Sequence, residues 1–354
     1  MTLSLKLLNE KNRDEWEAYV EHHPYATFFH RWAWRDILFE TYSYTPFYFG
    51  LFRAHRLCGI LPLFKMGFGP RKRWISIPFA DYAGPLTDGP EMNSEFLDRV
   101  SDFLKGGRLE LLTQTSLPLP EGWSEISPFC SFRLPVDLPF DALLKKYVHR
   151  KTRELIRKAA RAGITTERFE LSSETVSTYY PLFYRTLLRL KKLAFPQTFF
   201  ESIGRHFPQE SKLFISFSPL KNHSQDSKKV IPVAGMITFR FKNTLYLLSN
   251  GSHEAFLSVG CNNAVYGSVL DYACADSDIQ ILDFGSTIRN TPHHFFKKRW
   301  GGEEYPLFSV QNHPQKPNEH ESTSSPFQTA IATLLSPLPS RVVQTLTRLA
   351  YRYY

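Results

Sequence analysis

The two halves of this sequence share one order of expected secondary-structure elements. In residues 1–135, two helices precede a hairpin of residues 47–53 and 56–64, and a further helix and strands follow. In residues 165–310, two helices precede strands, a hairpin that turns at Lys242, and a helix that leads into a buried strand. The assignments rest on the spacing of apolar residues and on the turn residues between them. Because 354 residues exceed one core of usual size, we predict an α+β fold of two domains, each with a mixed, mainly antiparallel sheet.

A basic segment joins the two halves. We predict one helix over residues 141–162, ended by Gly163. Residues 145–161 hold eight Lys/Arg and one Glu, whereas the whole chain has a net charge of +9. Like charges at helical spacing repel each other, so the pattern favours an external anion over a merely solvated helix face. Arg153 and Arg157 lie one turn apart and would together hold a diphosphate, unless they are a solvated pair.

A second basic cluster follows the last buried strand of this order. Apolar residues 279–282 lead to Asp283, and an aromatic and basic stretch follows at residues 295–300. If that stretch is a strand, one of Lys297 and Lys298 faces inward and the other outward. A lysine that is partly desolvated beside a second cation has a lowered pKa. We therefore predict that Lys297 stabilises negative charge in a reaction, the alternative being a salt-bridged lysine at the surface.

Other kinds of site have little support in the sequence. The four cysteines have no paired spacing, so we expect reduced thiols of a cytoplasmic protein rather than disulfides or zinc ligands. The adjacent pairs His22-His23 and His293-His294 lack the spacing of metal ligands, and we predict no metal site. No apolar stretch has the length of a signal sequence or of a membrane span.

Four stretches of the sequence resemble those of one bacterial family. They are residues 23–30 with Trp34, residues 59–63 with 76–86, residues 151–159 with Gly163, and residues 283–285 with 296–301. In this order they resemble FemAB-like proteins, members of the wider GNAT (N-acetyltransferase) superfamily. They are most similar to the FemAB-like proteins found beside exopolysaccharide and exosortase (PEP-CTERM) systems.

The resemblance implies two tandem GNAT-like domains in one chain. The expected N-terminal domain covers residues 1–138, a basic connecting helix covers residues 139–164, and the C-terminal domain covers residues 165–310. A flexible linker over residues 311–325 and a helical tail over residues 326–354 would follow.

The resemblance also implies an activity. Fem enzymes move an aminoacyl group from a tRNA to the peptide of a cell-wall precursor, and other relatives are thought to use acyl-CoA. We therefore expect an acyltransferase that acts on an amino group of a cell-envelope glycan, a peptidoglycan precursor or an exopolysaccharide component. Its anionic co-substrate would be acyl-CoA or aminoacyl-tRNA, with no tightly bound cofactor. The acceptor would be a glycan or a lipid-linked precursor, met at the inner face of the membrane.

Two features depart from the family pattern. Ser286 stands where the family often has an arginine directly after Asp-Phe-Gly, and Arg289 is the residue that would replace that arginine at the donor site. The Gly-rich signature of CoA-binding acetyltransferases is absent, and residues 256–263 are the nearest segment.

The resemblance places several residues on the donor side. Lys297 matches the family's lysine at the donor site, and Lys298 would lie beside it. Ser258, Gly260 and Asn262 precede a helix whose N-terminus would bind the donor's pyrophosphate. The alternative is that Ser258 or Asn262 only caps that helix.

The acceptor side is expected in the first half of the chain and on the basic helix. Asp81 and Tyr82 would line a cleft between the domains, although a structural turn would use the same residues. Arg153 and Arg157 would hold a diphosphate of the acceptor.

Asp283 is open to several interpretations. At the end of a strand, it would act as a general base or orient the substrate amine. It would equally cap the turn, or pair with Arg289 or Arg299.

Two other functions remain open at this stage. One is a non-catalytic protein that binds RNA or another polyanion through residues 145–161. The other is a peripheral scaffold of polysaccharide assembly, which would contact an anionic membrane through residues 326–354.

Overall fold

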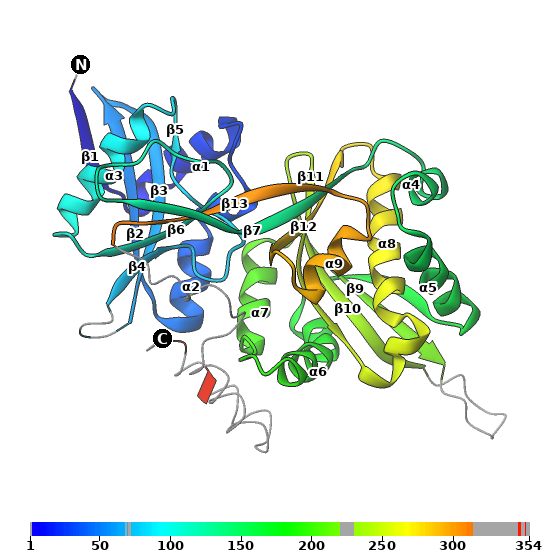
Figure 1. The fold of residues 1–354 in the computed structure, drawn as a ribbon. Coiled ribbons are helices and arrows are strands. Elements are labelled where there is room, and N and C mark those ends of the chain that lie inside the picture. The colour runs from blue at the N-terminus through cyan, green and yellow to red at the C-terminus, as the bar shows by residue number, and fades with distance from the viewer. Residues whose placement is uncertain are drawn as a thin grey trace.

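The first half of the chain forms a sheet with three helices (Figure 1). The structure is a computed structural model that describes residues 2–67, 69, 72–219, 230–313, 346–347 and 351. The elements of the first half are β1 (Leu3–Leu7), α1 (Arg13–His22), α2 (Trp34–Tyr42), β2 (Thr45–Arg53), β3 (Arg56–Met66), β4 (Arg73–Ser76), β5 (Leu86–Thr87), α3 (Met92–Phe103), β6 (Arg108–Thr113) and β7 (Ser124–Pro135).

The second half repeats this combination with more helices. Its elements are α4 (Phe140–Lys146), α5 (Arg150–Arg161), β8 (Thr165–Glu170), α6 (Ser173–Arg189), α7 (Gln197–His206), β9 (Ser211–Pro219), β10 (Val230–Phe241), β11 (Thr244–Ser252), α8 (Cys261–Ala275), β12 (Ile281–Ile288), α9 (Pro292–Lys298) and β13 (Glu303–Gln311). A short 3-10 helix, η4 (Glu254–Val259), precedes α8.

The strands form one continuous mixed sheet. Their order is β1-β2-β3-β4-β6-β13-β7-β12-β11-β10-β9-β8, and β5 pairs with β3. Among the described strands, the pairs β4–β6 and β11–β12 are parallel, and all other pairs are antiparallel. Each parallel pair is joined through one helix, α3 in the first half and α8 in the second. The two halves therefore contain the same strand–helix–strand unit, as their sequences predicted.

The strand β13 ties the halves together. It comes last in the described order of strands, yet it lies between β6 and β7 of the first half. On its other edge, β7 pairs with β12. Figure 1 shows β7 and β13 side by side as they cross from one half of the molecule to the other.

Aromatic side chains fill the contact between the halves. Phe28 stacks on Phe239 of β10, with ring centroids 4.1 Å apart, and Trp34 lies against Phe207. His30, in the same segment, is buried, and its Nε2 lies 3.0 Å from the carbonyl of Gly84. Residues 23–34, which carry part of the family resemblance, thus pack one domain on the other and hold the loop before β5.

The predicted helix over residues 141–162 is in fact two helices, α4 and α5. The chain leaves α4 at Tyr147, and the amide of His149 donates a hydrogen bond to the carbonyl of Arg299. His149 then begins α5 as its cap, because its Nδ1 accepts from the amide of Lys151. The continuous apolar spacing did not reveal this break, because a contact with a distant segment causes it.

The residues expected as a strand at 295–300 mainly form the helix α9 instead. Thr291 caps this helix by accepting a hydrogen bond from the amide of His294, and Pro292 occupies its first turn. Both residues are common at helix starts. The inward and outward placement of the two lysines survives the correction, since Lys297 is buried and Lys298 is exposed.

Two predicted segments lie almost entirely outside the described residues. The linker over residues 311–325 is described only to residue 313, and the tail over residues 326–354 only at residues 346–347 and 351. Within the portion of the chain that can be assessed, no helix combines the length and the apolar character needed to cross a bilayer.

Candidate functional site

The strands β11 and β12 pair only at their beginnings. Thr244–Tyr246 lie parallel to Ile281–Asp283, and neither strand has a partner residue on the other beyond these three. A cavity of about 100 Å³ opens where the pairing stops. Its walls include residues 247–250 of β11 and 284–286 of β12, together with Asp81, Tyr266, His293 and Lys297. We call it the strand cavity.

A bulge in β12 shapes the strand cavity. Asp283 pairs with Arg133 of β7, but Ser286 pairs with Ser131, so β12 holds one extra residue here. Gly285 has φ of +70°, and a Cβ atom on it would lie 2.7 Å from Oδ2 of Asp81. Glycine is therefore required by both the backbone conformation and the approach of Asp81.

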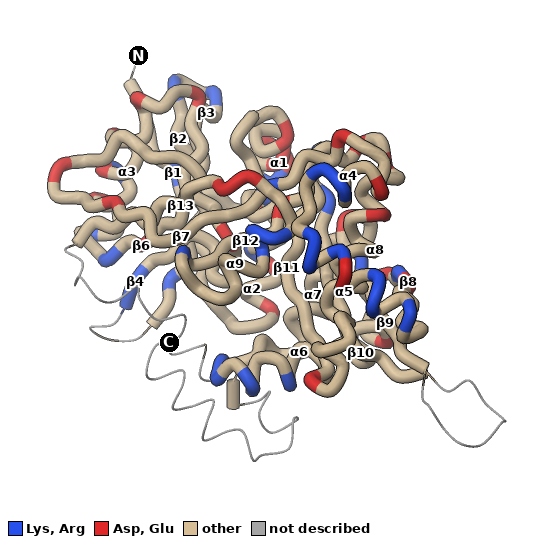
Figure 2. The backbone as a smooth tube through the Cα atoms, turned by 45° about the vertical axis from the view of Figure 1, so that its right-hand side comes forward, with Lys and Arg blue, Asp and Glu red and all other residues tan. Residues whose placement is uncertain are grey.

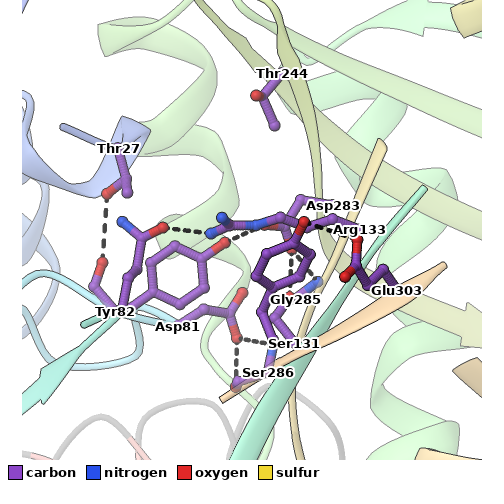
Figure 3. Close-up of polar contacts among 12 residues, drawn as sticks. Thr27, Asp81, Tyr82, Ser131, Arg133, Thr244, Asp283, Gly285, Ser286 and Glu303 are labelled. Atoms are coloured by element: carbon purple, nitrogen blue, oxygen red, sulfur yellow. Dashed lines mark hydrogen bonds and ion pairs between the residues drawn. The ribbon is translucent and has the colours of Figure 1, made fainter. Parts of the chain in front are cut away.

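Asp283 is completely buried at this bulge. Its Oδ1 accepts hydrogen bonds from the hydroxyl of Ser131, 2.7 Å away, and from the amide of Gly285, 2.8 Å away. Its Oδ2 accepts from the hydroxyl of Tyr82 and from Nε of Arg133 at 2.9 Å (Figure 3). Burial raises the pKa of Tyr82, so the phenol stays protonated and donates a hydrogen bond to the carboxylate.

The contacts of Asp283 narrow its interpretations. Both carboxylate oxygens already accept two hydrogen bonds each, which uses the in-plane lone pairs. The carboxylate caps the turn at Gly285, as one alternative predicted. The alternative pairing with Arg289 or Arg299 is wrong, because the ion-pair partner of Asp283 is Arg133.

Asp81 reaches the same bulge from the first half of the chain. Its Oδ1 accepts from both the amide and the hydroxyl of Ser286, at 2.8 and 2.6 Å (Figure 3). Burial raises the pKa of Asp81, and the positive charge of Lys297 and the bonds from Ser286 oppose that rise. Asp81 is thus a side chain of the first domain in the wall of a cavity in the second.

Lys297 lies buried beneath the bulge. Its Nζ donates hydrogen bonds to the carbonyls of Gly285 and Ser286, at 2.9 and 2.8 Å. Burial lowers the pKa of Lys297 to about 8, against the attraction of Asp81 and Asp283. The sequence predicted a lowered pKa but named the wrong second cause, because the exposed Lys298 is not among the charges that act on it.

The start of α8 is covered by the basic helix α5. A Cβ atom on Gly260 would lie 2.5 Å from the carbonyl oxygen of Leu155, and Nζ of Lys158 donates to the carbonyl of Ser258. Gly260 itself is the N-cap residue, and no side chain caps the helix, so the alternative of a cap from Ser258 or Asn262 is wrong.

The remaining predicted residues lie away from the strand cavity or at its edge. Asn262 accepts a hydrogen bond from Asn250, which lines the cavity. Arg289 is bound to Glu304 and to Ser127, and it does not line the cavity. Arg157 is exposed on α5.

Arg153 lies near Arg157 but is less accessible. It is half-buried, and its guanidinium donates to the carbonyl of Lys145 at 3.4 Å. Neither arginine lines the strand cavity.

A larger cavity, of about 690 Å³, lies in the first domain. Its walls come from residues 19–30, 56–57, 82–93 and 113–117. Tyr82 lines it, and so does Gln114, whose side-chain oxygen accepts from Arg133. Both residues are therefore bound to the network around Asp283, and Asp81 on the other side of that network lines the strand cavity.

Sequence reasoning missed Ser131, Arg133 and Gln114. The first two stand two residues apart on β7, so they point to the same side of the strand. Two polar side chains on one side of an otherwise apolar segment were the available signal.

Among the described residues, one group of side chains could hold a metal ion, although no metal site was predicted. Ligand atoms of Cys130, His294 and Glu304 all lie within 4.8 Å of one another. Glu304 is already paired with Arg289 at 2.7 Å and with His294 at 3.0 Å. Burial raises the pKa of the Cys130 thiol to about 11. These contacts satisfy the carboxylate without an ion.

Comparisons with known proteins agree with this architecture. Residues 146–298 match the family model of the acetyltransferase (GNAT) domain. The structure is similar to that of FemX, with a TM-score of 0.64 and 15% identity over 86% of this chain and 96% of that one. It is also similar to a tandem GNAT protein from the clavulanic acid biosynthesis pathway, with a TM-score of 0.54 and 11% identity over 89% of this chain and 100% of that one.

A third similar structure is the C-terminal domain of a putative lysylphosphatidylglycerol synthetase from Agrobacterium fabrum. Its TM-score is 0.53 and its identity 11%, over 93% of this chain and 97% of that one. No curated protein matches the sequence. The predicted fold class is confirmed: the chain is α+β and has two tandem GNAT-like domains.

Proposed function

We propose that the protein is an acyltransferase of the FemAB-like kind, which moves an acyl or aminoacyl group to an amino group of a cell-envelope glycan or its precursor. The observation that carries the proposal is the pair of cavities separated by the Tyr82–Asp283 network. The match of residues 146–298 to an acetyltransferase domain supports the reaction class. The donor is acyl-CoA or aminoacyl-tRNA, and neither is held as a resident cofactor.

The strand cavity suits the acyl group of the donor. Where β11 parts from β12, residues 247–250 of β11 remain next to β10 but have no partner on β12, so backbone groups on that edge face the cavity. Donors fixed in the protein backbone stabilise the oxyanion of an acyl transfer without reorganisation. Lys297 places a positive charge in the same wall, and its charge stabilises the oxyanion and the leaving group.

The larger cavity suits the acceptor. Its volume exceeds that of the strand cavity several-fold, and Tyr82 in its wall is hydrogen-bonded to Asp283. During transfer, the amino group of the acceptor has to pass from the larger cavity to the strand cavity. There its nitrogen attacks the donor carbonyl carbon, the bond from that carbon to the leaving group breaks, and the nitrogen loses a proton. Asp81, whose pKa is raised, accepts that proton, whereas Asp283 positions the groups around it.

A transfer assay with purified protein tests the proposal. Acyl-CoA and aminoacyl-tRNA donors are each offered with amino-sugar and lipid-linked acceptors, and product is measured by mass spectrometry. Lys297→Met should lower kcat at least a hundredfold, because it removes the buried charge. Lys65→Met is the control, since that side chain is exposed and lines neither cavity, and it should keep near-normal activity. Full activity of folded Lys297→Met would refute the role of Lys297, and the lack of transfer with every pair would count against the proposed reaction.

A further inference from the structure

The excess positive charge of the chain is concentrated on α4 and α5. Residues 145–161 hold eight Lys/Arg and one Glu, a net charge of +7 within a chain of net charge +9. Seven of these eight basic side chains are exposed. Figure 2 shows Lys and Arg positions in blue along α4 and α5. We call this exposed set the basic surface.

Few of these charges are neutralised by the protein. Among the described residues, the ion pairs of the basic surface are Arg150 with Glu154 and Lys146 with Asp137. In the part of the chain that the structure describes, no acidic group lies within ion-pair distance of Lys151, Arg157 or Arg161. Cations repeated at helical spacing destabilise a helix. An external anion would relieve that repulsion.

Apart from Lys158, which donates a hydrogen bond to the carbonyl of Ser258, these charges take no part in the packing of α5 on α8. The opposite face of α5 buries Thr152 and Ala159 and packs on α8. That packing holds the helix in place whether or not its outer face is charged. The charges on the outer face are thus available to a partner.

The shape of the basic surface indicates a large partner. A helix of 12 residues is about 18 Å long, which is more than one diphosphate can span. The exposed residues of α4 and α5 include no aromatic side chain on which the bases of a single-stranded nucleic acid could stack. A surface of many phosphate groups is long enough to contact the whole helix, and its binding needs no aromatic side chain.

Exposed apolar side chains lie in the two segments that are hydrogen-bonded to opposite ends of α5. Leu257, 37% exposed, precedes Ser258, whose carbonyl accepts a hydrogen bond from Lys158. Phe295, 49% exposed, lies one turn before Arg299, whose carbonyl binds the amide of His149 at the start of α5. Basic residues flanked by apolar side chains suit the boundary between lipid head groups and acyl chains. An RNA backbone offers no apolar surface in which these side chains could be buried.

We propose that the basic surface docks the protein on an anionic phospholipid bilayer. The docking needs no acyl transfer and would hold even if the proposed reaction is wrong. It has a consequence for that reaction, because α9 carries Lys297 of the strand cavity directly before Lys298 and Arg299 at the edge of the basic surface. A docked molecule therefore meets lipid-linked acceptors in preference to soluble ones.

Vesicle flotation with the full chain tests the docking. The probes are vesicles of phosphatidylcholine alone and with 30% phosphatidylglycerol. The test variant is Lys151→Glu, Arg157→Glu, Arg161→Glu, and the control is Lys11→Glu, Lys65→Glu, Lys105→Glu, three exposed lysines of the first domain. Both variants change the net charge equally. Thermal unfolding confirms that each is folded.

We expect binding to the anionic vesicles only, with a steep loss between 50 and 300 mM salt. The test variant should bind at least tenfold more weakly, and the control should bind within twofold of the wild type. Phe295→Ser should weaken the binding that remains at high salt. Equal binding to neutral vesicles, or equal losses in both variants, would overturn the proposal. Binding to tRNA but not to vesicles would also overturn it and would assign the basic surface to RNA.

Discussion

Asp81 and Ser286 join the two domains through one carboxylate oxygen, which accepts hydrogen bonds from both the amide and the hydroxyl of Ser286. The serine occupies the place where the FemAB-like proteins that this sequence resembles often have an arginine. A short hydroxyl allows Asp81 to approach the backbone of the bulge, close to Gly285. The departure from the family pattern therefore has a structural partner in the first domain.

Removing the hydroxyl of Ser286 should loosen this junction moderately. Ser286→Ala deletes one hydrogen bond to Asp81 and keeps the one from the backbone amide. We expect a loss of about 1 kcal/mol in the free energy of unfolding. Asp81→Ala should cost more, since it leaves the Ser286 amide and hydroxyl without their acceptor. A double-mutant cycle by urea denaturation measures the coupling, and additive effects would show that the two groups do not interact.

Asp283 should be far more sensitive to loss of charge than an exposed aspartate. Asp283→Asn keeps the shape of the side chain but leaves Arg133 without its buried partner. Removing one member of a buried ion pair costs about 3–5 kcal/mol. The control is Asp278→Asn. The side chain of Asp278 is 73% exposed in its ion pair with Arg240, so this substitution should cost below about 1 kcal/mol. Similar unfolding free energies for the two variants would contradict the assigned role.

The sequence predicted the two-domain architecture because each half has its own apolar periodicity and turn residues. It could not predict the position of β13. Its pairing with β6 depends on contacts across about 200 residues of sequence, for which no local pattern exists. The helix α9 was mistaken for a strand because the aromatic residues next to its lysines outweighed the Thr291-Pro292 start signal.

The site was predictable only in part for a similar reason. Lys297 was predicted from its basic and aromatic neighbours as well as from the family resemblance, and Asp81 and Tyr82 lie in a stretch that carries that resemblance. The structure brings all three to the bulge of β12. Arg133 carried no motif, and its role arises because β7 pairs with β12. Side chains that act through strand pairing between distant segments have no local signal.

Because of Lys297, a rise to alkaline pH should lower the transfer activity while it adds to the stability of the fold. Its pKa is lowered to about 8 in the folded protein, so between pH 8 and about 10.4 the unfolded chain binds more protons than the folded one. Stability therefore gains a contribution as pH rises through this range. Transfer activity should fall over the same range, because the charge on Lys297 is lost.

The comparison with Lys297→Met isolates this effect from the other groups that titrate at alkaline pH. From pH 8 to pH 10, the unfolding free energy of the wild type should increase relative to that of Lys297→Met. Lys298→Met should follow the wild type throughout. A difference that stays flat across this range would mean that the pKa of Lys297 is not lowered by folding.

Gly285 offers a test of how closely the domains approach each other at the bulge. In Gly285→Ala, the alanine would have to adopt the positive φ of +70°, and its Cβ atom would lie 2.7 Å from Oδ2 of Asp81. Gly106 has a similar φ of +67°, but a Cβ atom there meets nothing within 4 Å, so Gly106→Ala measures the backbone strain alone. That strain is about 1–2 kcal/mol. We expect Gly285→Ala to cost at least about 1 kcal/mol more, because Asp81 must move and weaken its bonds to Ser286. In Asp81→Ala the extra cost should largely vanish, and a cost that persists there would place the steric conflict elsewhere.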